Sequence, residues 1–201
     1  MNDFIFYWMA WLCWSWATWM MDKGKQRTQI AALALFAIIF ASYSFTIFQY
    51  NTNLSVLFFL CLAIYLLFEK SPFTQIYLYC SSIVISLGYA ALYLFSIYDP
   101  ISLLFPFAII ASVYFILMIT IFTKPFKYRL ALLFLSAPLG EIAIGIILNH
   151  LHLNNEIGMN GYLAIIAITF FSLIFFMLAK SFLQSFERFI NRLKQERKNV
   201  L

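Results

Sequence analysis

The sequence predicts an all-α fold, a polytopic membrane protein built as a bundle of about seven transmembrane helices. Hydrophobic residues make up 64% of the 201 residues, whereas charged residues make up only 10%. Apolar runs of about twenty residues recur along the chain, and this length fits the hydrocarbon core of a bilayer, which is about 30 Å thick. A water-soluble domain of this size could not bury so many such runs.

Seven spans are predicted, at residues 4–21, 28–48, 54–68, 73–98, 101–122, 130–149 and 163–183. The third span is short. It crosses the hydrocarbon core only if Asn53 and a snorkelling Lys70 lie at the two interfaces, or if the bilayer thins locally. Because no loop is long enough to fold separately, we expect one transmembrane domain, residues 1–183, followed by a basic amphipathic cytoplasmic tail, residues 184–201. No cleavable signal peptide is predicted, since no basic region precedes the first apolar run.

The positions of the basic residues predict the orientation of the spans. With seven spans, every Lys and Arg falls on one side of the membrane: in residues 23–27, at Lys70, in residues 124–129 and from Lys180 onward. Basic loops stay in the cytoplasm, so the N-terminus is expected outside and the C-terminus inside. The net charge of +5 then reflects topology, and no nucleic-acid partner is predicted.

The tail combines apolar and basic residues at helical spacing. We interpret it as an amphipathic extension of the last helix that lies in the interface and is attracted to anionic lipid at the cytoplasmic face. The alternative is a plain basic stop-transfer anchor. The residues concerned are Phe182, Phe186, Phe189, Ile190 and Leu193, with Arg188, Arg192 and Lys194 among them.

The first span holds all five tryptophans of the chain. On a helical wheel Trp8, Trp11 and Trp19 share one face, and Trp14 and Trp16 flank that face on either side. Ordinary packing against neighbouring helices and lipid is one interpretation of such an aromatic face. The other is a surface that binds a lipid, a cation or a membrane-protein partner.

The N-terminal residues FIFYWMAWLCWSWATWMMDKGKQR resemble the start of the YphA-type small membrane proteins of Bacillus-like bacteria. The resemblance rests on the aromatic residues up to Trp14 and on the Met21, Lys23 and Arg27 that follow. The length and the multipass pattern are also similar, although the motif covers only about an eighth of the chain. The resemblance implies a bacterial plasma-membrane location. The family has no assigned biochemical activity, so it implies no catalytic residues.

The sixth span carries Glu141, the only acid deep inside an apolar run. A charged side chain at the bilayer centre costs roughly 2.5–3.5 kcal/mol on insertion scales, so Glu141 marks a candidate site. The fourth span offers a partner surface, because its polar residues follow one helix face: Gln75, Tyr79, Ser82, Ser86, Tyr89 and Tyr93. We expect this face to turn inward and Glu141 to be held by Ser86 or Tyr89, with Tyr93 nearer the outer surface.

Pro138 and Gly140 predict a kink beside Glu141, because proline frees a backbone carbonyl and glycine allows close helix approach. If the helix persists, the face of Glu141 continues through Gly145 and Asn149 to His152, a polar path toward the outer surface. Burial favours the neutral carboxyl. The site is then either part of a proton-linked path or a hydrogen bond that holds helices together.

Enzymatic function is not predicted. A retinal lysine would have to lie in mid-span, and an intramembrane protease would need histidine or several acids at depth. The outer His150, His152 and Glu156 form only a weak metal pattern, and the three cysteines lie within apolar runs, so no metal, cofactor or disulfide is expected.

Two functions remain open from the sequence. The first is a small transporter or permeation protein, in which Glu141, Ser86, Tyr89, Asn149 and His152 line a proton-linked path. The second is a non-catalytic scaffold that binds another membrane protein or lipid through its first helix and its tail. A water-accessible cavity at Glu141 would favour transport, whereas a dry, packed environment would favour the scaffold.

Overall fold

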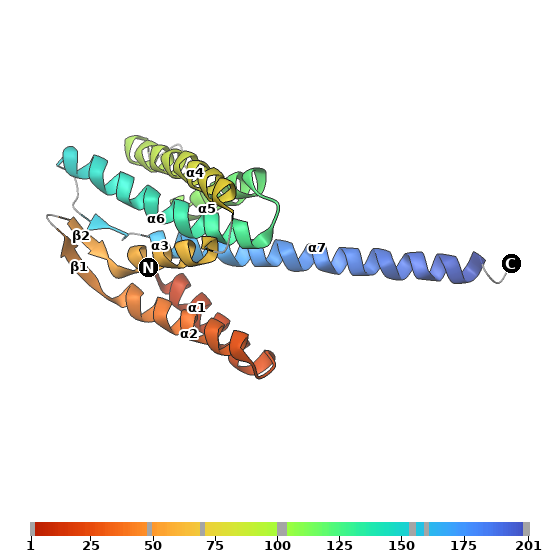
Figure 1. Ribbon diagram of the computed structural model, residues 1–201. Helices are drawn as coiled ribbons and strands as arrows, with labels where there is room; N and C mark the ends of the chain where they lie inside the picture. Colours follow the sequence, from red (N-terminus) through yellow and green to blue (C-terminus); the bar gives the residue numbers. More distant parts are fainter. Residues whose placement is uncertain are drawn as a thin grey trace.

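The computed structural model describes residues 3–47, 50–68, 71–99, 104–152, 156–158 and 161–198. Most of these residues belong to seven helices, and three short strands make up a small sheet (Figure 1). Their bounds are α1 Asp3–Met20, α2 Lys25–Ser42, α3 Leu54–Leu67, α4 Pro72–Tyr98, α5 Phe107–Phe122, α6 Phe126–His150 and α7 Tyr162–Lys198. Prolines mark three starts: Pro72 opens α4, and Pro106 and Pro125 directly precede α5 and α6. This position suits proline because the first helical turn needs no backbone donor.

Two helices differ from the predicted spans by about six residues: α2 ends at Ser42, where a small sheet begins, and α5 begins at Phe107, although its span was predicted from residue 101. Strands β1 Ser44–Ile47 and β2 Tyr50–Asn53 form an antiparallel hairpin, and β3 Glu156–Ile157 pairs in parallel with β2. The prediction that residues 28–48 form one span was therefore wrong beyond Ser42. The all-α class holds for the helical bulk of the chain, and the three short strands are an addition that the sequence did not predict.

Asn53 was expected at an interface if the short third span crosses the hydrocarbon core, and its place relative to the membrane stays a prediction. Its side chain is buried and caps the start of α3. Its Oδ1 accepts a hydrogen bond from the Ser55 amide at 2.9 Å, and its Nδ2 donates to the carbonyl of Ala41 at 3.0 Å. The hairpin thus links the C-terminal end of α2 to the N-terminal end of α3, which has fourteen residues. Lys70 lies outside the described residues.

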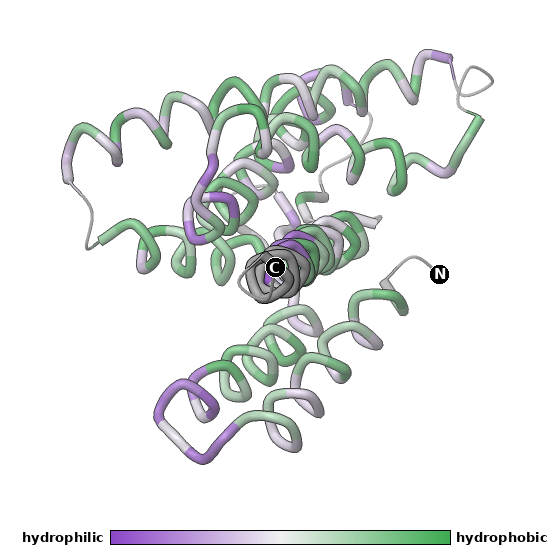
Figure 2. Tube along the Cα trace, turned by 90° about the vertical axis from the view of Figure 1, so that its right-hand side faces the viewer, coloured by the Kyte–Doolittle hydropathy of each residue, from purple (hydrophilic) through white to green (hydrophobic). Residues whose placement is uncertain are grey.

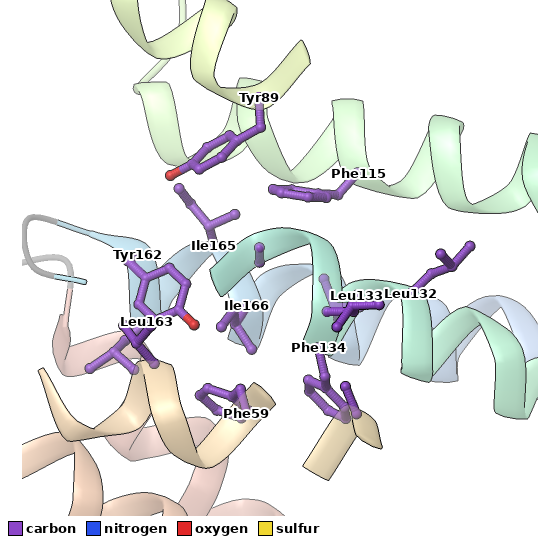
Figure 3. Close-up of a cluster of buried hydrophobic side chains, with 14 of the residues drawn as sticks. Phe59, Tyr89, Phe115, Leu132, Leu133, Phe134, Tyr162, Leu163, Ile165 and Ile166 are labelled. Carbon is purple, nitrogen blue, oxygen red and sulfur yellow. The ribbon is translucent and has the colours of Figure 1, made fainter. Parts of the chain in front are cut away.

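α6 lies at the centre of the core and contacts α3, α4, α5 and α7. Its residues from Ala131 to Pro138 are all buried. Phe134 stacks on Phe59 of α3, with ring centroids 5.3 Å apart, and on Phe170 of α7 at 6.0 Å. These three rings mark a common level in α3, α6 and α7 (Figure 3 shows Phe59 and Phe134).

α7 is the longest element and runs for 37 residues without a break. Its first half lies between the α1–α2 pair and the group formed by α3 to α6, as the end-on view in Figure 2 shows. Its second half leaves the bundle at the end opposite the sheet and projects far beyond it (Figure 1). The predicted tail, residues 184–201, therefore begins as a straight continuation of the last helix.

Candidate functional site around Glu141

Glu141 is buried in α6, and both of its carboxylate oxygens are hydrogen-bonded. The Tyr89 hydroxyl of α4 donates to Oε1 at 2.6 Å, and the backbone amide of Gly158 donates to Oε2 at 3.2 Å. The residue is only 7% exposed. Because both donors are uncharged, the carboxyl is held by hydrogen bonds alone, with no ion pair among the described residues.

Tyr89 can reach Glu141 because α4 and α6 approach closely at Gly140. A Cβ added to Gly140 would lie 2.5 Å from Cδ1 of Tyr89 and 3.4 Å from the carbonyl oxygen of Ser86. Only glycine leaves room for the tyrosine ring at this point. Gly140 thus lies where α4 and α6 approach closely. α6 continues through Pro138, and the kink itself stays a prediction.

Gly158 reaches Glu141 by entering the bundle from the sheet. Its φ of +78° is a conformation that glycine adopts without strain, and an added Cβ would collide with Val56. The preceding Ile157 packs against Gly145, so Gly145 accommodates a strand residue and not another helix. Neither contact was predicted.

The inner end of the sheet lies between the helices and not beyond their ends. Asn53 lies six residues from Phe59, about 9 Å along α3, and Glu141 lies seven residues from Phe134, about 10 Å along α6. The inner end of β2, the Gly158 amide and Glu141 therefore occupy one level. Asn149 lies about 12 Å farther out. A backbone amide at this depth needs a partner, and Glu141 provides it.

The polar face of α4 is only partly directed inward. Ser82, Ser86 and Tyr89 are buried, but Tyr79 is exposed on the outside of the bundle, contrary to the prediction. Ser86 does not hold Glu141, because its hydroxyl donates to the carbonyl of Ile83 at 2.8 Å. Tyr93 is half-buried and packs edge-on against Phe107, with ring centroids 5.3 Å apart.

The predicted line from Glu141 to His152 is interrupted at the C-terminal end of α6. Asn149 donates from Nδ2 to the Tyr50 hydroxyl at 3.0 Å, and so ties α6 to the hairpin. The helix ends at His150, and His152 has a φ of +55° and an exposed side chain. His152 therefore lies off the helix face that carries Glu141.

Tyr162, at the start of α7, belongs to the site although the sequence did not single it out. Its hydroxyl is buried and makes no hydrogen bond with the described residues, while its ring packs edge-on against Phe59. Cδ1 of Tyr162 would lie 3.8 Å from a Cβ at Gly158. Figure 3 shows Tyr162 among apolar side chains, with Phe59 and Ile166 nearby. No spacing pattern in the sequence links Tyr162 to Glu141.

The predicted lipid or partner surfaces are exposed where they are described. Trp8, Trp11 and Trp19 lie on the outside of the bundle, and Trp19 is 84% exposed. Arg188 is exposed in the α7 extension and donates from Nε to the carbonyl of Gln184 at 3.2 Å. Arg192 and Lys194 lie in the part of α7 whose side chains are outside the described residues.

The chain is similar to a known family of membrane proteins. A family model for YphA-like integral membrane proteins matches residues 2–199. The chain belongs to this YphA-like family. It is 24% identical to the uncharacterised protein YphA of Bacillus subtilis (strain 168) over 152 residues, which cover 75% of each chain. No solved structure matches. The resemblance of the N-terminal motif to YphA proteins is thereby confirmed for nearly the whole chain.

Membership in the YphA-like family also confirms the membrane class predicted from composition. Among the described residues, three helices are long and apolar enough to cross a bilayer: Pro72–Tyr98, Phe126–His150 and the Tyr162–Arg188 part of α7. α3 and α5 are shorter apolar helices. The number of spans, their orientation and the plasma-membrane location stay predictions.

Proposed function

We propose that this YphA-like protein is a non-enzymatic docking protein of the bacterial plasma membrane, and that the α7 extension is its docking element. The observation that carries the proposal is the projection of α7 beyond the bundle with large apolar side chains exposed (Figure 1). In this proposal the chain forms seven spans, the β1–β2 hairpin completes the outer part of the second and third spans, and the C-terminus is in the cytoplasm. The end of the bundle with the α1–α2 turn, where Lys23 and Lys25 lie, faces the same side as the extension.

In this proposal the membrane is positioned relative to the common level of Phe134 and Phe170. Lys127 lies seven residues inward of Phe134, about 10 Å, and Asn149 lies fifteen residues outward, about 22 Å. Their separation of about 33 Å is close to the thickness of a hydrocarbon core and its boundaries. Glu141 then lies in the outer half of the membrane.

On the same scale, the proposal has the extension in water. Phe182 follows Phe170 by twelve residues, so it lies about 18 Å inward of the common level and about 8 Å beyond Lys127. Phe186 lies about 6 Å farther. An isolated helix that exposes aromatic side chains to water is only marginally stable, so these residues indicate a surface that another helix covers.

The environment of Glu141 supports the docking protein over the proton-linked transporter. Tyr89 and Gly158 occupy both carboxylate oxygens, and Ser86 bonds its own helix. His152 lies off the helix face that carries Glu141. The sheet covers the side of Glu141 that would face the outer surface. In this proposal Glu141 holds α4, α6 and the sheet together, and it carries no proton across the membrane.

Photo-crosslinking in intact cells tests the docking role. We would place benzoylphenylalanine at Phe182, on the exposed apolar side of α7, and at Gln184, on the opposite side, as the matched control. The proposal expects a discrete protein adduct from position 182 and none from position 184. No protein adduct from either position, together with proton flux in proteoliposomes that Glu141→Gln abolishes, would overturn the proposal in favour of transport.

The anionic-lipid role of the tail is the competing interpretation of the same segment. Lys180 and Arg188 are exposed on it and suit a lipid headgroup. An interfacial helix must lie in the membrane plane, however, whereas α7 continues straight from its span. An efficient adduct between position 182 and lipid, with none to protein, would favour this interpretation.

A further inference from the structure

The turn between α1 and α2 forms an open pocket of about 490 Å³, which is lined by residues 20–27. The turn lies at the end of the bundle from which α7 projects (Figure 1), and Figure 2 shows hydrophilic residues gathered at it. α1 and α2 each have 18 residues, about 27 Å. Because this length is close to the thickness of the hydrocarbon core, the pocket meets the headgroups of one leaflet.

The pocket carries a net positive charge. Three basic residues, Lys23, Lys25 and Arg27, line it together with one acid, Asp22. None of these four side chains has an ion-pair or hydrogen-bond partner among the described residues. The positive charge of the pocket is therefore not balanced by the part of the chain that the structure describes.

Arg27 differs from the two lysines in its burial. Lys23 and Lys25 are exposed, whereas Arg27 is partly buried. A side chain that is already restrained loses less conformational entropy when it binds a ligand. A guanidinium group can donate two parallel hydrogen bonds to phosphate oxygens, and a lysine ammonium group adds a point charge. The donors in this pocket therefore suit a phosphate group.

The stability of α2 does not explain these charges. Lys25 and Arg27 lie in the first turn of α2, and this turn contains no acidic residue. The dipole of a helix disfavours cations at its N-terminal end, and three neighbouring cations also repel each other. The positive-inside rule requires basic residues on one side of the membrane, but it does not require a pocket. A bound anion would offset both unfavourable terms.

We propose that this pocket binds the phosphate of an anionic phospholipid in the leaflet that it faces. The apolar residues beside the basic ones favour a lipid over a free phosphate ion. Met20 lines the pocket, Trp19 precedes it, and both side chains are strongly exposed. A tryptophan at this level contacts the glycerol region and the upper part of the acyl chains. This site goes beyond the proposed docking role and does not depend on it.

Quenching of Trp19 fluorescence by brominated lipid tests the site. Trp8, Trp11, Trp14 and Trp16 are replaced by phenylalanine, which leaves Trp19 as the one tryptophan of the chain. The full-length protein is placed in nanodiscs of phosphatidylcholine with a small fraction of phosphatidylglycerol. Bromine is carried either by the phosphatidylglycerol or by an equal fraction of the phosphatidylcholine. The proposal expects the brominated phosphatidylglycerol to quench Trp19 about fivefold more efficiently.

Charge variants show whether the pocket causes this preference. Lys25→Gln with Arg27→Gln should make the two lipids quench equally. Lys124→Gln with Lys127→Gln is the matched control, because it removes two exposed basic residues near the start of α6 and should keep the preference. Lys25→Arg with Arg27→Lys preserves the charge and should also keep it. Equal quenching before substitution, an equal loss in both glutamine variants, or a full loss in the charge-preserving variant would each overturn the proposal.

Native mass spectrometry of the protein with all five tryptophans gives a second readout, which does not depend on the phenylalanine substitutions. The proposal expects phosphatidylglycerol to remain bound in preference to phosphatidylcholine. Lys25→Gln with Arg27→Gln should reduce these adducts by about fivefold. Equal retention of the two lipids by the unaltered protein would contradict the proposal.

Inorganic phosphate distinguishes the two sources of the phosphate group. Sodium phosphate and sodium chloride are compared at the same ionic strength in the quenching experiment. The proposal expects both salts to weaken the quenching by phosphatidylglycerol to the same extent, because each acts only by screening charge. A stronger loss in sodium phosphate would show that the pocket takes a free phosphate ion, and the assignment to a lipid would be wrong.

Discussion

The Tyr89 hydroxyl lies 2.6 Å from Oε1 of Glu141, and this hydrogen bond joins two helices through residues that are 52 positions apart in the chain. Through this hydrogen bond, Tyr89 of α4 holds the Glu141 side chain of α6 in place. The carboxylate also accepts from Gly158, so one side chain connects two helices and the sheet.

Tyr89→Phe should destabilise the protein by about 1–3 kcal/mol, since it removes a buried donor and leaves part of the carboxylate unsatisfied. Reversible unfolding in mixed micelles measures this change. Tyr79→Phe is the matched control, because Tyr79 is exposed on the same helix and should change the free energy of unfolding by less than about 0.5 kcal/mol. Equal effects of the two substitutions would mean that the hydrogen bond contributes nothing.

Glu141→Gln and Glu141→Leu should differ clearly. Glutamine keeps an oxygen for the Gly158 amide and an amide group that can donate to the Tyr89 oxygen, so the free energy of unfolding should change by about 1 kcal/mol or less. Leucine leaves both donors buried without a partner and should cost about 2–4 kcal/mol. The same unfolding assay compares them. If leucine were as stable as glutamine, Glu141 would not be the structural link between α4, α6 and the sheet.

Gly140→Ala should destabilise the bundle by about 1–3 kcal/mol, because the new methyl group collides with the Tyr89 ring. Gly24→Ala serves as the control: its nearest neighbour would be 4.0 Å away, and its φ of −171° is accessible to alanine. Thermal unfolding followed by tyrosine and tryptophan fluorescence reports both variants. A neutral Gly140→Ala would show that α4 and α6 can separate without loss.

Tyr162→Phe should leave stability unchanged or raise it by up to about 1 kcal/mol, although the hydroxyl is fully buried. The hydroxyl has no hydrogen-bond partner among the described residues, so its removal ends a desolvation cost and breaks no bond. The sign is opposite to that of Tyr89→Phe. A loss of more than about 1 kcal/mol would show that a bound molecule uses the Tyr162 hydroxyl.

Much of the helical part of this fold could be predicted from the sequence. The apolar runs located the helices to within a few residues, because each run must match the membrane thickness. From the sequence, Glu141 was predicted to lie against the polar face of α4, with Ser86 and Tyr89 as alternative partners; in the structure the donor is Tyr89. The site was predictable to this extent because a lone acid and a polar helix face have few other ways to be satisfied.

The sheet and Gly158 could not be predicted. β3 has two residues, so no alternation marks it, and its partner β2 lies about a hundred positions earlier. Glycine occurs in many kinds of turn, so its presence at position 158 does not by itself predict a left-handed φ. The residues next to it in the sequence do not indicate that its amide approaches Glu141. A long-range contact made by backbone atoms leaves little trace in residue types.

The parallel pairing of β2 with β3 sets an order for biogenesis. The β1–β2 hairpin and α3 leave the ribosome long before residues 156–158, since α4, α5 and α6 are synthesised between them. During this interval the outer edge of β2 is open, and Glu141 enters the membrane with Tyr89 already available but without the Gly158 amide. The order of synthesis thus gives Glu141 its two partners one after the other: the helix partner is made before it, and the backbone partner from the sheet is made after it.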